Sequence, residues 1–320
     1  MINVLILGVT GFSGKHLYNF LKNCKNIKLF GTYFNADLNL MKKFFGPDIE
    51  LMKCNVSNFE EIAHILKISE PDQIYYLSSV VTVAKSENLS LKIYNTNAGG
   101  AYNIYEGVKK ICPSAKVVAV GSAEEYGKVS ENELPISESV ALYPVSAYGL
   151  SKKIAEEIGL FYFNVFNIDI RFTRTFHFSG PMQPSSFVIS DFAKQIVEIE
   201  GGKKDKIFVG NLEAKRDFTD IRDAVRAYFL IMNEGKPGEI YNVCSGTSYK
   251  ISDILNLLIS KSEKNVKVEI DKKKIRPLDV PDFRGDNKKL SLQTSWNPEF
   301  ILNHTIEDVL KYWRNNVSSA

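Results

Sequence analysis

The sequence predicts an α/β fold, a doubly wound parallel sheet of the Rossmann type joined to a smaller C-terminal substrate domain. Apolar runs of strand length alternate with stretches of helical period through the N-terminal half, a glycine-rich turn follows the first run, and the alternation loosens after about residue 176. Strands that alternate with helices form βαβ units, whose strands are parallel. A chain of 320 residues is long enough for one large domain or two closely joined ones.

Six apolar runs are expected to form the strands of the main sheet. They do not alternate between apolar and polar residues, which is typical of parallel strands covered on both faces. The stretches between them each show one apolar helix face, formed in the first by Leu17, Phe20 and Leu21. The expected strands span residues 3–7, 27–32, 49–53, 73–77, 116–121 and 168–173.

The C-terminal part has longer loops and more prolines. Short strands are expected at residues 207–209, 239–243 and 266–270, and helices at 187–200, 221–233, 251–260 and 306–315. Ser252 and Asp253 are candidate N-caps for the third of these helices. We predict a dinucleotide-binding domain of residues 1–175, to which residues 213–240 return, and a substrate domain of residues 176–212 and 241–320.

The composition excludes several classes of protein. The chain has 40 basic and 37 acidic residues, a net charge of +3 and scattered basic residues, which is not the pattern of a nucleic-acid binder. The four cysteines lie far apart without a CxxC pair, so neither a disulfide framework nor a metal site is expected. The chain shows no signal peptide and no window of about 18 apolar residues, so we expect a cytoplasmic protein that does not bind membranes.

Three glycines mark the turn after the first strand, at residues 8–14 (GVTGFSG). In such a turn one glycine permits a sharp reversal, one lets a pyrophosphate approach the backbone, and one lets the helix pack close to the strand. The helix that follows offers free amides and its positive dipole end to an anion. A position between strand and helix therefore predicts a dinucleotide site at Gly8, Gly11, Phe12, Ser13 and Gly14.

The end of the second strand influences the choice between NAD and NADP. An NAD enzyme usually has Asp or Glu there to bind the ribose hydroxyl. This chain has Thr32 followed by Tyr33, Phe34 and Asn35. The lack of a carboxylate permits a 2′-phosphate, although no arginine is present to bind one, so NADP(H) is favoured and NAD(H) is possible. Asn55, after the third strand, is a candidate contact to the adenine.

Tyr148 and Lys152 are spaced four residues apart, which places them on one helix face. An ammonium near a phenol favours the phenolate and lowers the pKa of the phenol. The pair can then transfer the proton that accompanies hydride transfer at a carbinol carbon. Ser122, at the end of the fifth strand, is expected to hydrogen-bond the same substrate oxygen. Ile154 and Ile158 are expected to form the inward stripe of the helix.

Together these motifs resemble those of the extended short-chain dehydrogenases/reductases, over nearly all of the chain. The sequence is most similar to the nucleotide-sugar enzymes of the GDP-mannose branch, the GDP-6-deoxy-D-mannose reductases in particular. Residues 121–127 (GSAEEYG) and 146–152 (SAYGLSK) are typical of the superfamily. More specific to the branch are residues 174–183 (RTFHFSGPMQ), 209–220 (VGNLEAKRDFTD), 241–246 (YNVCSG) and 276–281 (RPLDVP).

The resemblance implies reduction of the C4 ketone of a GDP-linked 6-deoxy sugar with a nicotinamide cofactor. Ser122 and Tyr148 would act on the C4 oxygen, and Lys152 would contact Tyr148 and the nicotinamide ribose. Asn97 would belong to the supporting network at the cofactor, and Glu124 would be an acid facing C5 and C6 of the sugar.

The resemblance also implies contacts to the substrate and to a second copy of the chain. Arg216 and Arg276 would contact the diphosphate or the nucleotide. His177 stands where the family usually has an Asn that contacts the nucleotide sugar, and a ring that ionises near neutral pH could mean an altered sugar. Homodimers of the family commonly form through the helices that hold Asn97 and Tyr148, and Phe161 and its aromatic neighbours are candidates for core or dimer face.

Three other functions remain compatible with the sequence. A 4,6-dehydratase of the same family would regenerate its cofactor internally and use Glu124 as an acid/base group. Ala123, where dTDP-glucose dehydratases have Asp, is evidence against that type but not against GDP-mannose dehydratases. A C4 epimerase is a further possibility. A cofactor-sensing binding protein on this fold would generally lack the Tyr or the Lys, both of which this chain keeps.

Overall fold

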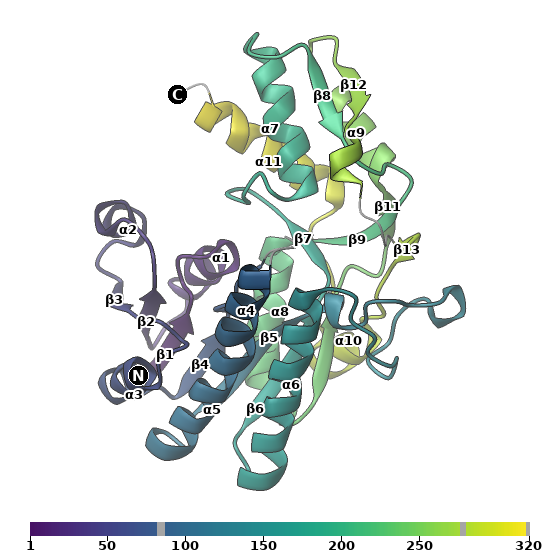
Figure 1. The fold of residues 1–320 in the computed structure, drawn as a ribbon. Coiled ribbons are helices and arrows are strands. Elements are labelled where there is room, and N and C mark those ends of the chain that lie inside the picture. The colour runs from purple at the N-terminus through teal and green to yellow at the C-terminus, as the bar shows by residue number, and fades with distance from the viewer. Residues whose placement is uncertain (82–86, 276–279, 318–320) are drawn as a thin grey trace.

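The computed structural model describes residues 1–81, 87–275 and 280–317, and a seven-stranded parallel sheet lies at its centre (Figure 1). The strand order is β10-β6-β5-β4-β1-β2-β3, with parallel pairing throughout. The predicted doubly wound fold is therefore confirmed. The strands are β1 (Ile2–Leu7), β2 (Ile27–Tyr33), β3 (Ile49–Lys53), β4 (Gln73–Tyr76), β5 (Lys116–Ser122), β6 (Ile170–Thr175) and β10 (Ile240–Val243).

Helices cover both faces of the central sheet. On one face α1 (Phe12–Leu21), α2 (Leu38–Phe45), α8 (Ile221–Glu234) and α10 (Lys288–Thr294) bury a core that includes Leu17, Tyr228 and Trp296. On the other face α3 (Phe59–Ser69), α5 (Gly100–Ile111) and α6 (Ala147–Phe166) bury a second core, and α4 (Glu87–Tyr94) packs on α6. This double cover explains why the strand sequences are continuously apolar.

A smaller unit lies beyond the carboxyl edge of the sheet, at the top of Figure 1. Its core is formed by α7 (Val188–Glu200), α9 (Ile251–Ser260) and α11 (Leu302–Val317), beside β8 (Lys206–Val209) and β12 (Lys267–Ile270). Between this unit and the main sheet runs β9 (Lys215–Asp220), which pairs with β7 (His177–Ser179), β11 (Ser248–Lys250) and β13 (Asp282–Phe283).

The course of the chain between the two units differs from the boundaries drawn from the sequence. Residues 241–320 were assigned to the substrate domain, but β10 pairs with β6 in the central sheet, with Ile240 opposite Phe172. Trp296, after α10, is buried against α8 and its indole nitrogen donates to the Asp223 backbone oxygen at 3.0 Å. Conversely, β9 lies within the segment expected to return to the dinucleotide domain, yet it belongs to the smaller sheet.

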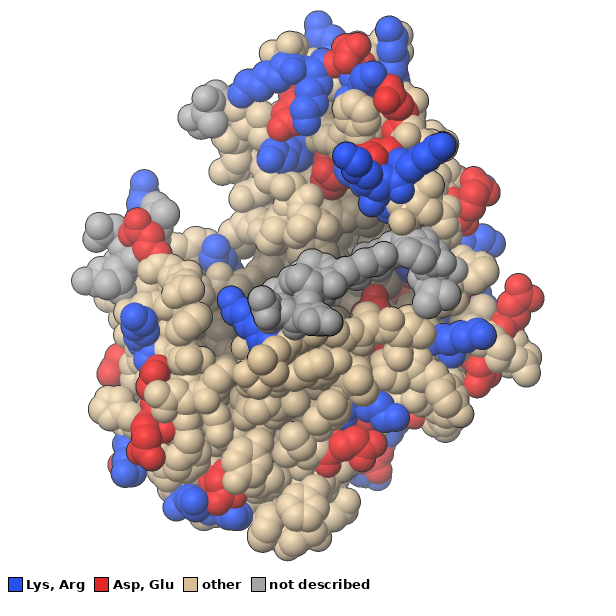
Figure 2. All heavy atoms as spheres, in the orientation of Figure 1, with Lys and Arg blue, Asp and Glu red and all other residues tan. Residues whose placement is uncertain are grey.

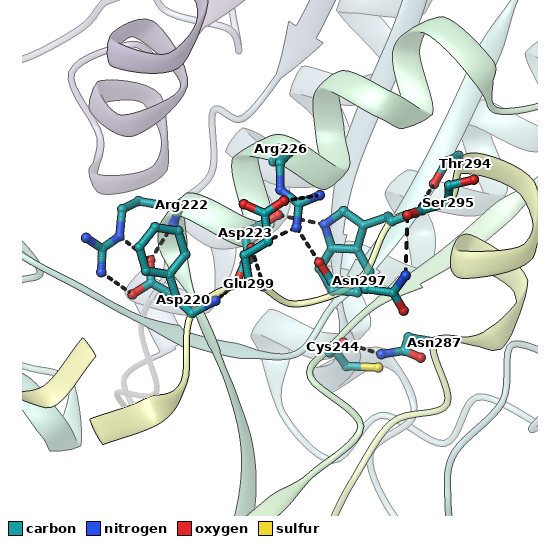
Figure 3. Close-up of polar contacts among 12 residues, drawn as sticks. Asp220, Arg222, Asp223, Arg226, Cys244, Asn287, Thr294, Ser295, Asn297 and Glu299 are labelled. Carbon is teal, nitrogen blue, oxygen red and sulfur yellow. Dashed lines mark hydrogen bonds and ion pairs between the residues drawn. The ribbon is translucent and has the colours of Figure 1, made fainter. Parts of the chain in front are cut away.

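Figure 3 shows how the segment after α10 is held on α8. The buried Asp223 carboxylate accepts hydrogen bonds from the backbone amides of Glu299 (3.1 and 3.0 Å) and Phe300 (3.0 Å) and from Arg226 (2.9 Å). A carboxylate that accepts several hydrogen bonds tolerates burial. This contact fixes the point at which the chain leaves the main sheet for α11.

Two local expectations are wrong. The N-cap of α9 is Lys250, without a side-chain capping bond, and Ser252 and Asp253 lie inside the first turn because the helix begins at Ile251. On α6, Ile154 is exposed, since the helix buries the face that carries Lys152, Ala155, Glu156 and Gly159. None of the helices in the described part of the chain has the length and apolar character needed to cross a membrane.

Candidate active site

The ends of β1, β4 and β5 meet at the carboxyl edge of the central sheet, where they are neighbours. The chain winds from β1 towards β3 on one side and from β4 towards β6 on the other, so the strand order reverses between β1 and β4. Open α/β sheets bind ligands in the crevice outside such a reversal. Figure 2 shows the surface hollowed between the main sheet and the smaller unit.

The glycine turn after β1 has the geometry of an anion cradle. Gly8 has a φ of +89°, and a Cβ there would lie 2.8 Å from Ser78 Oγ. A Cβ on Gly14 would lie 2.4 Å from the Gly8 carbonyl oxygen, so α1 packs against the turn at a distance that only glycine allows. Gly11 is the N-cap of α1 and has no side chain to accept the first amides of the helix. The turn therefore fits the pyrophosphate of a dinucleotide.

The other residues predicted to bind the cofactor lie near the glycine turn or at the carboxyl ends of β2 and β3. Thr32 is buried behind the turn, where its hydroxyl accepts the Gly8 amide at 2.9 Å. Phe12 stacks on Phe178 of β7, with ring centroids 5.8 Å apart. Ser13 lies half-buried in the first turn of α1. Asn55 accepts the Ser57 amide at 3.1 Å and so closes the turn that precedes α3.

Tyr148 is held by hydroxyl groups from two adjacent strand ends. Its phenol is hydrogen-bonded to Ser122, the last residue of β5, and to Ser79, in the loop after β4. Burial raises the pKa of Tyr148 above its ordinary value, against the lowering effect of these two hydrogen bonds. The phenol is therefore protonated at neutral pH. This corrects the expectation that Lys152 shifts it towards the phenolate, because desolvation is the larger effect.

Lys152 is buried one turn along the same helix, with 5% of its surface exposed. Its Nζ donates to the Val120 backbone oxygen at 2.8 Å and lies 5.9 Å from the centroid of the Tyr76 ring. Burial lowers the pKa of Lys152 to about 8, and the nearby charge of Glu125 opposes that shift. Tyr148 and Lys152 both lie on α6, as the predicted helix spacing requires.

Asn97 connects the loop after β4 to α6. It lies in a π-helical turn, Asn95–Gly99, between α4 and α5, and such turns frequently occur at functional sites. Its Oδ1 accepts from the Val80 amide (2.8 Å) and the Ser79 hydroxyl (3.3 Å), and its Nδ2 donates to Ser151 Oγ (2.9 Å). Ser151 in turn donates to the Tyr148 backbone oxygen at 2.7 Å. Asn97 thus fixes Ser79 relative to Tyr148.

Two neighbouring glutamates follow Ser122 in a short 3₁₀ helix, Ala123–Glu125. Glu124 is half-buried, its amide donates to Ser122 Oγ at 3.2 Å, and its charge acts on Tyr148. Glu125 is fully buried, and its Oε1 accepts the Ser122 amide at 2.7 Å. Glu125 was not among the predicted site residues, although Ser followed three residues later by Glu is the signature of a capping box. Ser79 was not predicted either, and a pair of serines after a buried strand is a weak signal for it.

The predicted substrate contacts lie farther from the sheet. Thr175 pairs with Ser122, and His177 begins β7 two residues later, half-buried against Phe218, with ring centroids 5.7 Å apart. Arg216 of β9 donates to the backbone oxygens of Lys215 and Val280, both at 2.7 Å. Arg276 lies outside the described residues. Within the described ranges, no three His, Cys, Asp or Glu residues are grouped so that they could hold a metal ion.

Comparisons with known proteins agree with this architecture. A family model described as GDP-mannose 4,6 dehydratase matches residues 5–309. The GDP-6-deoxy-D-mannose reductase of Pseudomonas aeruginosa is 29% identical over 248 residues, covering 77% of this chain and 82% of that protein. The GDP-mannose 4,6 dehydratase 1 of Arabidopsis thaliana is 26% identical over 318 residues, covering 92% of this chain and 85% of that protein.

A solved structure of a related protein has the same fold. The structure of RMD from Pseudomonas aeruginosa complexed with NADPH has a TM-score of 0.85 and 25% identity, covering 98% of this chain and 99% of that one. The chain therefore belongs to the GDP-mannose 4,6 dehydratase family, in the nucleotide-sugar branch of the extended short-chain dehydrogenases/reductases.

Proposed function

We propose that the protein reduces the C4 ketone of a GDP-linked 4-keto-6-deoxy sugar, with Tyr148 as the proton donor. The observation that carries this proposal is the placement of the Tyr148 phenol, which Ser122 and Ser79 hold by hydrogen bonds at the sheet edge beside the glycine turn. A protonated phenol is the form that a reduction needs. The similarity to a GDP-6-deoxy-D-mannose reductase supports this choice of reaction.

Each residue of the site has a role in this reaction. When bound, the nicotinamide cofactor supplies the hydride to the ketone carbon. Tyr148 gives its proton to the C4 oxygen, to which Ser122 donates a hydrogen bond. The Lys152 ammonium stabilises the negative charge left on the phenol and binds the ribose hydroxyls. Asn97 holds Ser79 and Tyr148 in fixed positions relative to one another. The backbone amides at the start of α1 hold the pyrophosphate.

We further propose NADP(H) as the preferred cofactor. The end of β2, with Thr32, Tyr33, Phe34 and Asn35, has no carboxylate to repel a 2′-phosphate. The related structure from Pseudomonas aeruginosa is a complex with NADPH, which supports the same preference. His177, Arg216 and Arg276 remain the proposed contacts to the nucleotide sugar.

A homodimer is proposed through the helices beside the site. Large apolar side chains are exposed on one face, with Leu91 on α4, Tyr102 on α5, and Leu150, Phe161 and Val165 on α6. In Figure 2 the surface over α5 and α6 is mostly free of charged side chains. Contiguous exposed apolar area of this kind marks an interface. Sedimentation of the wild type and of a Phe161→Glu variant tests it, since a wild-type monomer would refute the interface.

A 4,6-dehydratase is the second candidate, because Glu124 is half-buried near Tyr148 and could remove the C5 proton. The two candidates make opposite predictions for Glu124→Gln. A reductase needs no acid/base group at C5, so the variant should keep most of its ketone reduction. A dehydratase depends on that carboxylate and should lose its activity.

One assay separates the candidates. GDP-mannose and the GDP-4-keto-6-deoxy sugar are supplied in turn with NADPH, and the absorbance of the reduced cofactor is followed. The proposal predicts stoichiometric NADPH oxidation with the keto sugar only, in the wild type and in Glu124→Gln but not in Tyr148→Phe. Consumption of GDP-mannose without net change of the cofactor would refute the reductase.

A further inference from the structure

One side chain of α1 contacts the segment that leads from β7 into the smaller unit. His16 lies one turn into the helix that follows the glycine turn, and its Nε2 lies 2.9 Å from the Pro181 backbone oxygen. A carbonyl oxygen can only accept, so Nε2 carries the proton and donates it. Burial lowers the pKa of His16, so the ring is neutral at neutral pH and has this single N–H to donate.

Ring contacts hold His16 in this position. Phe12 and His16 form an edge-to-face pair with centroids 5.2 Å apart, and Phe12 stacks on Phe178 of β7. A Cβ on Gly180 would lie 2.4 Å from Ile221 Cγ2 at the start of α8, so the chain passes the main unit at a distance that only glycine allows. The start of α1 and the end of β7 are therefore packed directly against one another.

The turn that carries Pro181 is closed by the buried side chain of Gln183. Its Nε2 donates to the Phe178 backbone oxygen and its Oε1 accepts from the Ser179 hydroxyl, both at 2.8 Å. Met182 has a φ of +71°, a left-handed conformation that a residue other than glycine keeps only where its surroundings enforce it. The turn is therefore held in one conformation.

The same turn is bound to the core of the smaller unit. The Gln183 backbone oxygen accepts from the Ser190 hydroxyl of α7 at 2.6 Å. Ser190 in turn accepts from Trp313 Nε1 of α11 at 2.9 Å. His16 thus holds the turn from the helix of the glycine turn, and Ser190 holds it from the smaller unit.

The strand before this turn carries proposed contacts to the nucleotide sugar. β7 begins with His177, which pairs with Phe218 of β9, and Arg216 lies two residues earlier on β9. We propose that His16 is a positioning residue, whose hydrogen bond to Pro181 fixes these contacts relative to the helix that holds the cofactor. The proposal rests on the proposed function, because that function places the cofactor at α1 and the sugar at β7 and β9.

His16→Phe removes the donor but keeps a ring beside Phe12. Its kcat/KM for the GDP-4-keto-6-deoxy sugar should fall by about tenfold, the scale of one hydrogen bond. Its dissociation constant for NADPH should stay close to the wild-type value, because the amides at the start of α1 are unchanged. His16→Gln offers an amide N–H in place of Nε2 and should restore kcat/KM. Ser190→Ala, which releases the other attachment of the turn, should behave like His16→Phe.

Tyr18→Phe is the matched control. Tyr18 lies on the same helix, its hydroxyl also donates to a backbone oxygen, that of Phe45 at the end of α2, and the substitution keeps the ring. This bond stays inside the dinucleotide unit, so its loss should lower stability against urea without lowering kcat/KM. A readout without turnover is the binding of GDP to the NADP⁺-bound protein, measured by calorimetry, which should weaken in His16→Phe and Ser190→Ala only.

Several results would overturn the role of His16. They are wild-type kcat/KM and GDP binding in His16→Phe or Ser190→Ala, a His16→Gln variant as impaired as His16→Phe, or an equal loss in Tyr18→Phe. A parallel loss of NADPH binding in His16→Phe would also overturn it, because His16 would then act on the glycine turn itself. A wild type that does not reduce the keto sugar refutes the proposed function instead, and the GDP titration still tests His16, so the two failures are distinguishable.

Discussion

The bidentate pair between Arg174 and Glu156 should be one of the most sensitive points of the fold. Both side chains are 5% exposed, and they share two hydrogen bonds of 3.0 and 2.6 Å. In Glu156→Gln the buried guanidinium loses its counter-charge. Hydrogen bonds to charged groups contribute about 1.5–3 kcal/mol each, and breaking a buried pair costs about 3–5 kcal/mol, so both routes give about 4 kcal/mol.

The assay is urea unfolding followed by tryptophan fluorescence. Trp296 is fully buried against α8 and reports on the main sheet, whereas Trp313 on α11 reports on the smaller unit. A loss of about 4 kcal/mol corresponds to a melting temperature lower by about 6 °C for a chain of 320 residues.

The chain offers a control with the same geometry at the surface. Arg314 and Glu200 form a bidentate pair at 2.9 and 2.7 Å, with the Arg314 side chain 43% exposed. Glu200→Gln should cost less than about 1 kcal/mol because solvent replaces the lost interaction. If Glu156→Gln destabilises the protein no more than Glu200→Gln, burial does not set the strength of the inner pair and the reasoning is wrong.

Three further outcomes are expected. Tyr148→Phe should lower kcat by about 10²–10⁴ while NADPH binding is retained, and turnover near the wild-type rate would remove Tyr148 from the chemistry. Gly14→Ala should abolish NADPH binding in a folded protein, because the added Cβ would lie 2.4 Å from the Gly8 oxygen, whereas Gly201→Ala, whose nearest contact would be 3.5 Å, should bind normally. Burial raises the pKa of Asp217 from 3.8 to about 6. Between pH 3.8 and about 6 the folded state therefore holds a proton that the unfolded state has released. The stability of the wild type relative to Asp217→Asn should therefore fall as the pH rises from about 4 to 6, and parallel urea midpoints over that range would contradict the assignment.

Much of the fold could be predicted because the responsible forces are local. Continuous apolar runs identified six of the seven strands of the main sheet to within about two residues, and the helical periods indicated helices between them. The glycine turn and the spacing of Tyr148 and Lys152 are also local patterns, since backbone freedom and the helix repeat do not depend on the rest of the chain.

Other features depend on which segments meet in space. Nothing local to residues 240–243 indicates that they pair with β6, and nothing near Ser79 indicates that β4 lies beside β5. The Tyr148 pKa was expected to fall because Lys152 is close in sequence, but it rises because the fold removes the phenol from water. The sequence by itself determined the elements and the reactive groups. Strand neighbours, burial and the pairing of Arg174 with Glu156 were decided by the tertiary structure, because desolvation and charge pairing depend on residues far apart in the chain.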